Sequence, residues 1–522
     1  MPAYFHASVS PWLKRCLVFV ILSASVTGFT QQSMFTKVYY DAQGSAQAYA
    51  TVEGPDHGFY IAGQKDLLGL AMKTDSAGTI EWAFKVGSFI GDFYDLVLTN
   101  DSCIVFAGST YNPVNPTTDL LILKMTPAGD TVWTRTLDLG NDDILSSIKL
   151  TPDGGFILSC KSGVGTAVIR LDPDGELVWS TAFAIANASM AVFSVTPSTD
   201  GGYYVTGSTD GYPMGNGDMF LGRLEADGTC SRAWALSTLG VSFGLDVVIQ
   251  TDGLMCLVES PAGLGLMKTD LAGNPLWYRS YNLFFNSNWN YGPVPNLRQT
   301  ADGDFIFLDG SGYGPGFGVK VSSAGDAVLR ANVFLNTADI TETHDGGYLF
   351  TGNGPILGVE MAGTDAPQIG IIKTDPMFTA TGCLWPETAW FDEVSFSKDT
   401  FAVYMGSPGT VFKMSYEIHD AGLSTDTGCV AFIGAVNDQS ANEIYLDVYP
   451  NPASGSVSFR LNPESSDNKI NRLEIYSATG IKVAEIPDPG SRMDLSKYPS
   501  GLYLLRAETT SGNLTTRIVL IK

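Results

Sequence analysis

The sequence predicts an all-β protein whose main part is a seven-bladed β-propeller, because it combines a repeat period near fifty residues, four short strands in each repeat and almost no helical periodicity. In each repeat an aspartate at or beside a Gly-rich turn opens a short apolar strand. Successive aspartates are separated by 45, 52, 47, 52, 50 and 43 residues. They are Asp56, Asp101, Asp153, Asp200, Asp252, Asp302 and Asp345. A nearly constant period is typical of a repeat fold rather than of several unrelated domains.

The second half of each repeat is predicted to be a β-hairpin, since two apolar runs flank a tight Asp/Gly turn, most clearly at 171–179. A tryptophan follows the turn glycine by four residues in four repeats, at Trp82, Trp133, Trp179 and Trp277. In repeat four, Trp234 lies further from the turn glycine, and in repeat six Leu329 takes the tryptophan position. We therefore interpret the aromatic residue as a packing preference. Repeat three predicts strands at 144–151, 155–161, 166–171 and 176–183.

The seventh repeat supplies only three strands, and a ring of blades with one strand missing would expose a sheet edge. An apolar run at 34–40 precedes the first repeat. Phe35 lies 21 residues before Asp56, and Trp179 lies the same distance before Asp200. We therefore expect 34–40 to be the fourth strand of the last blade, with Phe35 in the tryptophan position.

The N-terminal 30 residues are predicted to be a secretory signal peptide. Lys14 and Arg15 precede an apolar run at 16–22, and small residues follow up to Gly28. The run is shorter than the roughly 20 apolar residues that a membrane helix needs, and no later stretch approaches that length. The sequence thus predicts an exported protein with no transmembrane segment.

Residues 446–522 contain a series of small-residue and aromatic motifs between alternating apolar strands. They are Tyr449, Pro450, Asn451 and Pro452, followed by Gly480, Gly501 and Tyr503. In this order the segment resembles the C-terminal sorting domains of type IX secretion. The resemblance implies a small β-sandwich that is recognised by an outer-membrane translocon and removed by a sortase-like protease. The cargo would then be outside the cell, either attached to the outer-membrane surface or released.

The propeller part has a resemblance of its own. The segments 202–209 and 218–224 resemble the SBBP-type repeats of bacterial seven-bladed propellers. That family shares no common reaction, so the resemblance implies a fold and no activity.

The predicted organisation is a signal peptide at 1–30, a propeller at 31–383, a β-rich spacer at 384–445 and a sorting domain at 446–522. Cys383 and Cys429 each follow a Thr-Gly pair and lie outside the predicted blades. Because export permits disulfides, we predict a bond between them.

Composition limits the chemistry. With 54 acidic and 30 basic residues the net charge is -24, which disfavours nucleic acid and anionic lipid as partners. His57 and His344 flank turn aspartates and are interpreted as turn residues, so neither a metal site nor a cofactor is predicted. One run, at 240–244, has the Gly-x-Ser-x-Gly spacing, but none of the few histidines lies near it in the sequence. Paired carboxylates for glycoside hydrolysis stay open, although the sequence selects no pair.

The loops between second and third strands, and those between blades, share one face of a propeller, where function usually lies. Aromatic residues are frequent in these loops and lie near asparagines. They are Tyr111, Tyr212, Phe284, Phe285, Trp289, Tyr291 and Tyr313. Such residues suit stacking on sugar rings or anchoring of a protein partner. The prediction is a secreted or surface-displayed binding protein for a glycan or a surface protein. The alternative is a carbohydrate-active enzyme, a glycoside hydrolase or lyase, and a redox enzyme with a quinone cofactor ranks third.

Overall fold

The computed structural model describes the chain in segments, with the intervening residues left out of the description. The described residues are 34–40, 44–87, 89–113, 116–163, 165–184, 190–209, 217–237, 240–283, 295–309, 316–333, 336–353, 368–379, 384–386, 392–393, 397–400, 404–406, 410–412, 418–420, 424–426, 445–449, 456–462, 469–477, 482–487, 490, 492–499, 501–510 and 512–520. None of these segments forms an apolar helix of membrane-spanning length.

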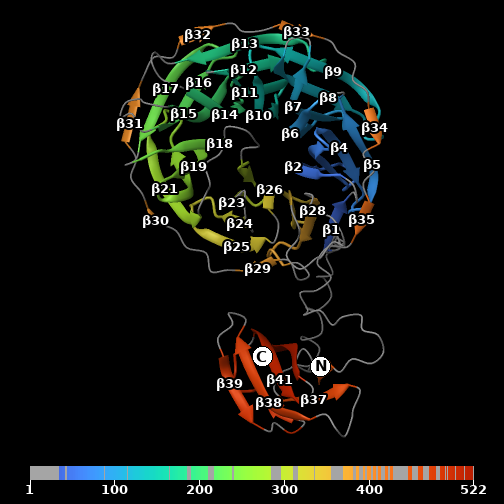
Figure 1. Ribbon diagram of the computed structural model, residues 1–522. Coiled ribbons are helices and arrows are strands. Elements are labelled where there is room, and N and C mark those ends of the chain that lie inside the picture. The colour runs from blue at the N-terminus through green and yellow to red at the C-terminus, as the bar shows by residue number, and fades with distance from the viewer. Residues whose placement is uncertain are drawn as a thin grey trace, which may run out of the picture.

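The described part of the chain is built from β-strands, and seven five-stranded antiparallel sheets are arranged as the blades of a ring (Figure 1). Blade 1 contains β2 (Ala46–Glu53), β3 (Phe59–Lys65), β4 (Leu68–Thr74) and β5 (Ile80–Val86). Blade 2 contains β6 (Gly91–Leu98), β7 (Ile104–Asn112), β8 (Thr117–Met125) and β9 (Thr131–Asp138). Blade 3 contains β10 (Asp143–Leu150), β11 (Phe156–Ser162), β12 (Gly165–Leu171) and β13 (Leu177–Ala184). The four strands predicted for repeat three agree with blade 3 to within one residue at each end.

The next blades follow the same plan. Blade 4 contains β14 (Met190–Pro197), β15 (Tyr203–Thr209), β16 (Asp218–Leu224) and β17 (Cys230–Ser237). Blade 5 contains β18 (Phe243–Gln250), β19 (Gly253–Ser260), β20 (Gly263–Thr269) and β21 (Pro275–Leu283). Blade 6 contains β22 (Arg298–Gln299), β23 (Phe305–Asp309), β24 (Gly316–Val321) and β25 (Ala327–Val333). Blade 7 contains β26 (Asn336–Glu342), β27 (Tyr348–Asn353), β28 (Ile369–Thr374) and the N-terminal strand β1 (Phe35–Tyr40). The all-β propeller prediction is confirmed.

The ring closes as the sequence predicts, because β1 pairs with β28 and places Phe35 opposite Lys373. Trp133 stands opposite Lys124 and Trp179 opposite Arg170 in the equivalent pairs of strands. Phe35 therefore occupies the tryptophan position of blade 7.

The glycine and tryptophan of the hairpin motif pack across the boundary between blades. Gly228 in blade 4 has φ 84°, and a Cβ added there would lie 2.7 Å from the Trp179 ring of blade 3. Trp179 also donates its indole N–H to the carbonyl oxygen of Ala226 at 3.0 Å. The turn therefore needs glycine both for its left-handed backbone and for the close approach of the neighbouring ring. The motif is structural, as expected.

The seven repeated aspartates are also structural. Each one forms an ion pair of 2.5 to 2.9 Å with a lysine or arginine on the third strand of its own blade, which ties the first turn to the sheet. The basic partners are Lys73, Lys124, Arg170, Arg223, Lys268, Lys320 and Lys373, in blade order.

A belt of seven short strands from residues 384–426 encircles the ring (Figure 1). They are β29 (Leu384–Pro386), β30 (Asp392–Glu393), β31 (Ser397–Thr400), β32 (Tyr404–Gly406), β33 (Thr410–Phe412), β34 (Ile418–Asp420) and β35 (Ser424–Asp426). They pair antiparallel with the outer strands of blades 6, 5, 4, 3, 2, 1 and 7, in that order. These strands do not form a small sheet of their own, because each covers the outer edge of a blade, where an unpaired strand would invite association with other chains.

Buried aspartates on the inner strands connect neighbouring blades around the centre of the ring. Asp95 of β6 accepts the backbone N–H of Ile148 in blade 3 at 2.9 Å. Asp246 of β18 accepts the N–H of Leu297 at 2.8 Å, and Asp339 of β26 accepts the N–H of Thr51 at 2.9 Å. These contacts fix the relative positions of the inner strands.

The buried Asp95 predicts how the stability of the fold depends on pH. Burial raises its pKa to about 6, against about 3.9 in an unfolded chain. The folded state therefore holds a proton that the unfolded state has lost, so this group's contribution to stability falls as the pH rises from about 4 to about 6. Urea unfolding of Asp95→Asn should show a weaker loss of stability across this range. Asp153→Asn is the control of opposite sign, because hydrogen bonding from Thr151 and the Arg170 charge lower the pKa of Asp153.

The C-terminal residues form a β-sandwich. One sheet contains β36 (Tyr445–Tyr449), β37 (Ser456–Asn462) and β40 (Arg492–Asp494). The other contains β38 (Ile470–Ser477), β39 (Lys482–Pro487), β41 (Gly501–Thr509) and β42 (Gly512–Leu520). Phe459 of the first sheet and Ile475 and Leu505 of the second share one buried core, which is the architecture that the sequence predicts.

Candidate functional site

Of the predicted aromatic residues, the structure describes Tyr111, which lies on β7 near the loop between β7 and β8 and is 39% exposed. Six predicted residues lie outside the described residues: Tyr212, Phe284, Phe285, Trp289, Tyr291 and Tyr313. Cys383 and Cys429 also lie outside them, as does the predicted signal peptide. The disulfide and the aromatic face therefore stay predictions.

The sorting motif is described in part. Tyr503 on β41 is buried and donates its hydroxyl to the carbonyl oxygen of Pro499 at 3.0 Å. Tyr449 ends β36 and Gly501 begins β41. Pro450, Asn451, Pro452 and Gly480 lie outside the described residues.

Near Tyr111 three aspartates converge at the boundary between blades 2 and 3. Asp119 is on β8, Asp138 ends β9 and Asp143 begins β10, and one carboxylate oxygen of each lies within 4.8 Å of the others. We call these three residues the loop-face cluster, because they border the β7–β8 loop and the connection between the two blades. No motif in the sequence marks these three residues. Asp119 and Asp143 are 24 positions apart, and only the packing of two blades brings them together.

Hydrogen bonds orient the carboxylates of the loop-face cluster. Asn112 donates its side-chain N–H to Asp119 at 2.8 Å. The backbone N–H of Leu139 donates to Oδ2 of Asp143 at 2.8 Å. The other carboxylate oxygen of Asp143, Oδ1, is buried and receives no hydrogen bond of good geometry among the described residues, although the nearby Ser162 side chain offsets part of the increase that burial causes in the pKa of Asp143. A buried oxygen of this kind is costly unless an ion or water satisfies it.

The raised pKa values in the cluster also favour a bound cation. Burial raises the pKa of Asp143 to about 7, and the neighbouring charges of Asp119 and Asp138 add to the increase. The pKa of Asp119 is raised as well, first by burial. A bound cation would neutralise this repulsion and favour the ionised carboxylates. Carboxylate oxygens are the ligands that Ca²⁺ prefers.

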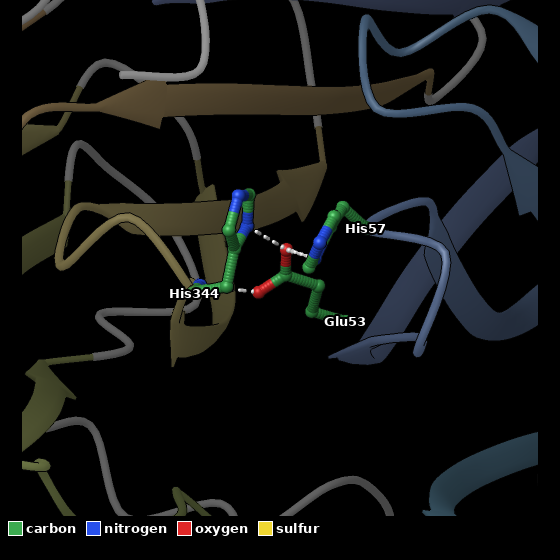
Figure 2. A group of neighbouring side chains, drawn as sticks. All are labelled: Glu53, His57 and His344. Carbon is green, nitrogen blue, oxygen red and sulfur yellow. Dashed lines mark hydrogen bonds and ion pairs between the residues drawn. The ribbon is translucent and has the colours of Figure 1, made fainter. Parts of the chain in front are cut away.

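A different constellation lies on the opposite, short-turn side of the blades, between blades 1 and 7 (Figure 2). Glu53 ends β2, His57 lies in the β2–β3 turn, and His344 lies in the β26–β27 turn. The two histidine rings stack with centroids 3.5 Å apart. Both are turn residues, as predicted, but their proximity was missed because they are 287 positions apart. Ring closure by β1 is the signal that could have brought the first and last turns together.

Three solved structures resemble this chain at a distance. A dihydro-heme d1 dehydrogenase, NirN, has 11% identity and a TM-score of 0.41, over 75% of this chain and 76% of its own. The extracellular domain of a B. thetaiotaomicron protein described as a one-component system has 12% identity and a TM-score of 0.34, over 90% of this chain and 61% of its own. A luciferin-regenerating enzyme has 13% identity and a TM-score of 0.32, over 51% of this chain and 90% of its own. Scores this low carry no argument about function.

The C-terminal sandwich has a family match. No curated protein matches the chain. Residues 447–522 match the model of the secretion system C-terminal sorting domain. The matched range covers the sandwich and includes the motif residues from Tyr449 to Tyr503. The C-terminal segment is thus a type IX secretion sorting domain, which directs the protein to the cell surface or the extracellular space.

Proposed function

We propose that this exported propeller is a binding protein that holds a Ca²⁺-type cation in the loop-face cluster and binds a glycan or a surface protein beside it. The observation that carries the proposal is the buried Oδ1 of Asp143, which receives no hydrogen bond of good geometry from the residues that the structure describes and belongs to a group of three carboxylates. Tyr111 is exposed near the end of β7, beside the same loop, and offers an aromatic surface for a ligand on the sheet face opposite to that of Asp119.

The ion pairs of the repeated turns support a cation site on the loop face rather than at the turns. The seven turn aspartates already have basic partners within their own blades, so they have no need of a cation. Within the loop-face cluster, Asp143 departs from the repeat, because Ala46, Gly91 and Met190 begin the first strands of blades 1, 2 and 4, whereas Asp119 recurs as Asp218 in blade 4. A departure from the repeat is where a specific function is expected on a repeat scaffold.

The alternative of a glycoside hydrolase has less support at this cluster. Its catalytic carboxyl groups need access to the sugar and a separation of about 5 to 10 Å. Asp143 is completely buried, Asp119 is 1% exposed, and their oxygens lie closer than 4.8 Å. The arrangement suits a cation better than an acid and base pair.

The test is binding of the purified full chain to arrays of glycans and of outer-surface proteins, in Ca²⁺ and in EDTA. We expect saturable binding that EDTA reduces at least tenfold and that Asp143→Asn and Tyr111→Ala both weaken. Asp174→Asn is the matched control, since Asp174 is an exposed turn aspartate outside the cluster. Binding that is equal in EDTA and in all variants would overturn the proposal, and so would blank arrays.

A further inference from the structure

We propose that Glu53, His57 and His344 bind a divalent transition-metal ion of the Zn²⁺ class, which links the first and the last blade of the ring. Figure 2 shows the three side chains converging from blades 1 and 7. Two imidazole nitrogens and one carboxylate oxygen are a ligand set that zinc uses in proteins with an open coordination position. This site shares no residue with the loop-face cluster, so each proposal can be tested independently of the other.

The distances suit an ion of this size. Oε1 of Glu53 lies 2.6 Å from Nδ1 of His344 and 3.3 Å from Nδ1 of His57. One ligand atom from each residue lies within 4.8 Å of the others. A tetrahedral Zn²⁺ with ligands about 2.0 to 2.1 Å away separates them from one another by about 3.3 Å. The ion therefore requires a small movement of Glu53 away from His344 and a rotation of one imidazole ring, because the rings now stack with planes 20° apart and a metal lies in the plane of each imidazole that it binds.

The carboxylate is held in position. Oε2 of Glu53 accepts the backbone N–H of His344 at 2.6 Å, so Oε1 is the oxygen that faces the rings. The Glu53 side chain is 11% exposed, whereas His57 is 47% and His344 32% exposed. Water or a further ligand can therefore reach the remaining coordination position from solvent.

The neighbouring blade boundary shows that the fold does not need the histidines. Between blades 6 and 7, Glu342 accepts the backbone N–H of Ala301 at 2.7 Å, which repeats the contact of Glu53 with His344. At that boundary Ala301 takes the position of His344, and Gly346 takes the position of His57, counted from the turn aspartates. The same backbone contact thus forms with both imidazoles absent.

His57 is also held in an unfavourable backbone conformation. Its φ is 63°, in the left-handed region, where Gly154, Gly201 and Gly346 stand in the equivalent turns with φ of 85°, 89° and 77°. Ser102 has the equivalent position in blade 2 with φ 62°, so the turn tolerates a residue with a Cβ at a cost in backbone strain, and glycine fits it without strain. Replacing His57 by glycine should relieve the strain and remove one ligand.

The experiment measures thermal unfolding and calorimetric titration of the full chain, stripped with EDTA, in Zn²⁺ and in Ca²⁺. We expect Zn²⁺ to bind with a stoichiometry of about one at this site and to raise the Tm saturably, because an ion that binds only the folded state stabilises it. The double variant His57→Gly/His344→Ala reproduces the residues of the next boundary. We expect it to fold and to bind Zn²⁺ at least tenfold more weakly.

Matched controls separate ligation from packing. Glu53→Gln should weaken Zn²⁺ binding, whereas Glu342→Gln removes the same carboxylate at the neighbouring boundary and should leave it unchanged. Asp143→Asn should also leave the Zn²⁺ response unchanged, which distinguishes this site from the loop-face cluster. No Zn²⁺-dependent shift in the unmodified chain, or the same shift in the double variant, would overturn the proposal.

Discussion

A chain that lacks residues 34–40 is expected to lose its folded monomeric state. β1 pairs with β28 on one edge and with the belt strand β35 on the other, so the deletion opens blade 7 on both sides. Val38 and Tyr39 are buried, and their burial contributes about 3 to 6 kcal/mol. That is a large part of the roughly 5 to 15 kcal/mol by which proteins are stable. The exposed edges should then pair with other chains.

Light scattering after gel filtration, together with thermal unfolding, measures this effect. A synthetic peptide with the sequence 34–40 should restore part of the monomer when it is added during refolding, and a scrambled peptide should not. If the deleted chain stays monomeric with an unchanged Tm, then β1 does not close the ring.

The second large effect concerns export. Without residues 446–522, the protein should accumulate inside the native host instead of reaching the surface or the medium, because the matched sorting domain is removed. The propeller strands and the belt end before this segment, so the truncated chain should fold normally. Fractionation and immunoblotting measure its location, and circular dichroism of the purified truncated chain checks the fold.

The complementary control transfers residues 446–522 to an unrelated periplasmic reporter. The reporter should move to the surface or the medium in a host with the secretion system and should stay in the periplasm in a host that lacks it. Unchanged surface display of the truncated chain would contradict the assignment.

Much of the propeller could be predicted because the repeat carries local signals. The turn aspartates and the turn glycines recur in the chain at regular intervals, and each acts within a blade or between adjacent blades. Gly228 and Trp179, for example, follow a spacing that can be counted in the sequence. The position of Phe35 followed from the same count, since closure requires one strand from the other end of the chain.

The belt could not be predicted in the same way. Its strands have two to four residues, too few for a periodic pattern, and they follow the ring in reverse order. Each belt strand pairs through its backbone, so its side chains carry little information about which outer strand it pairs with. The sequence predicts a β-rich spacer at 384–445 but not that its strands join seven different sheets.

The candidate sites escaped sequence analysis for a related reason. Asp119 and Asp143 belong to different blades, and Glu53 and His344 belong to the first and the last blade. No spacing in the sequence marks such pairs, because the fold alone brings them together. The resemblance of the C-terminal segment, by contrast, depends on contiguous motifs, so export could be predicted where ligand chemistry could not.

The most direct test of the loop-face account is calorimetric titration of the EDTA-treated full chain with Ca²⁺, compared with Asp143→Asn. The account predicts saturable binding near one equivalent in the unmodified chain, at a pH above the raised pKa of Asp143, and binding at least tenfold weaker in the variant. Absence of Ca²⁺ binding, or equal binding by both proteins, would contradict it.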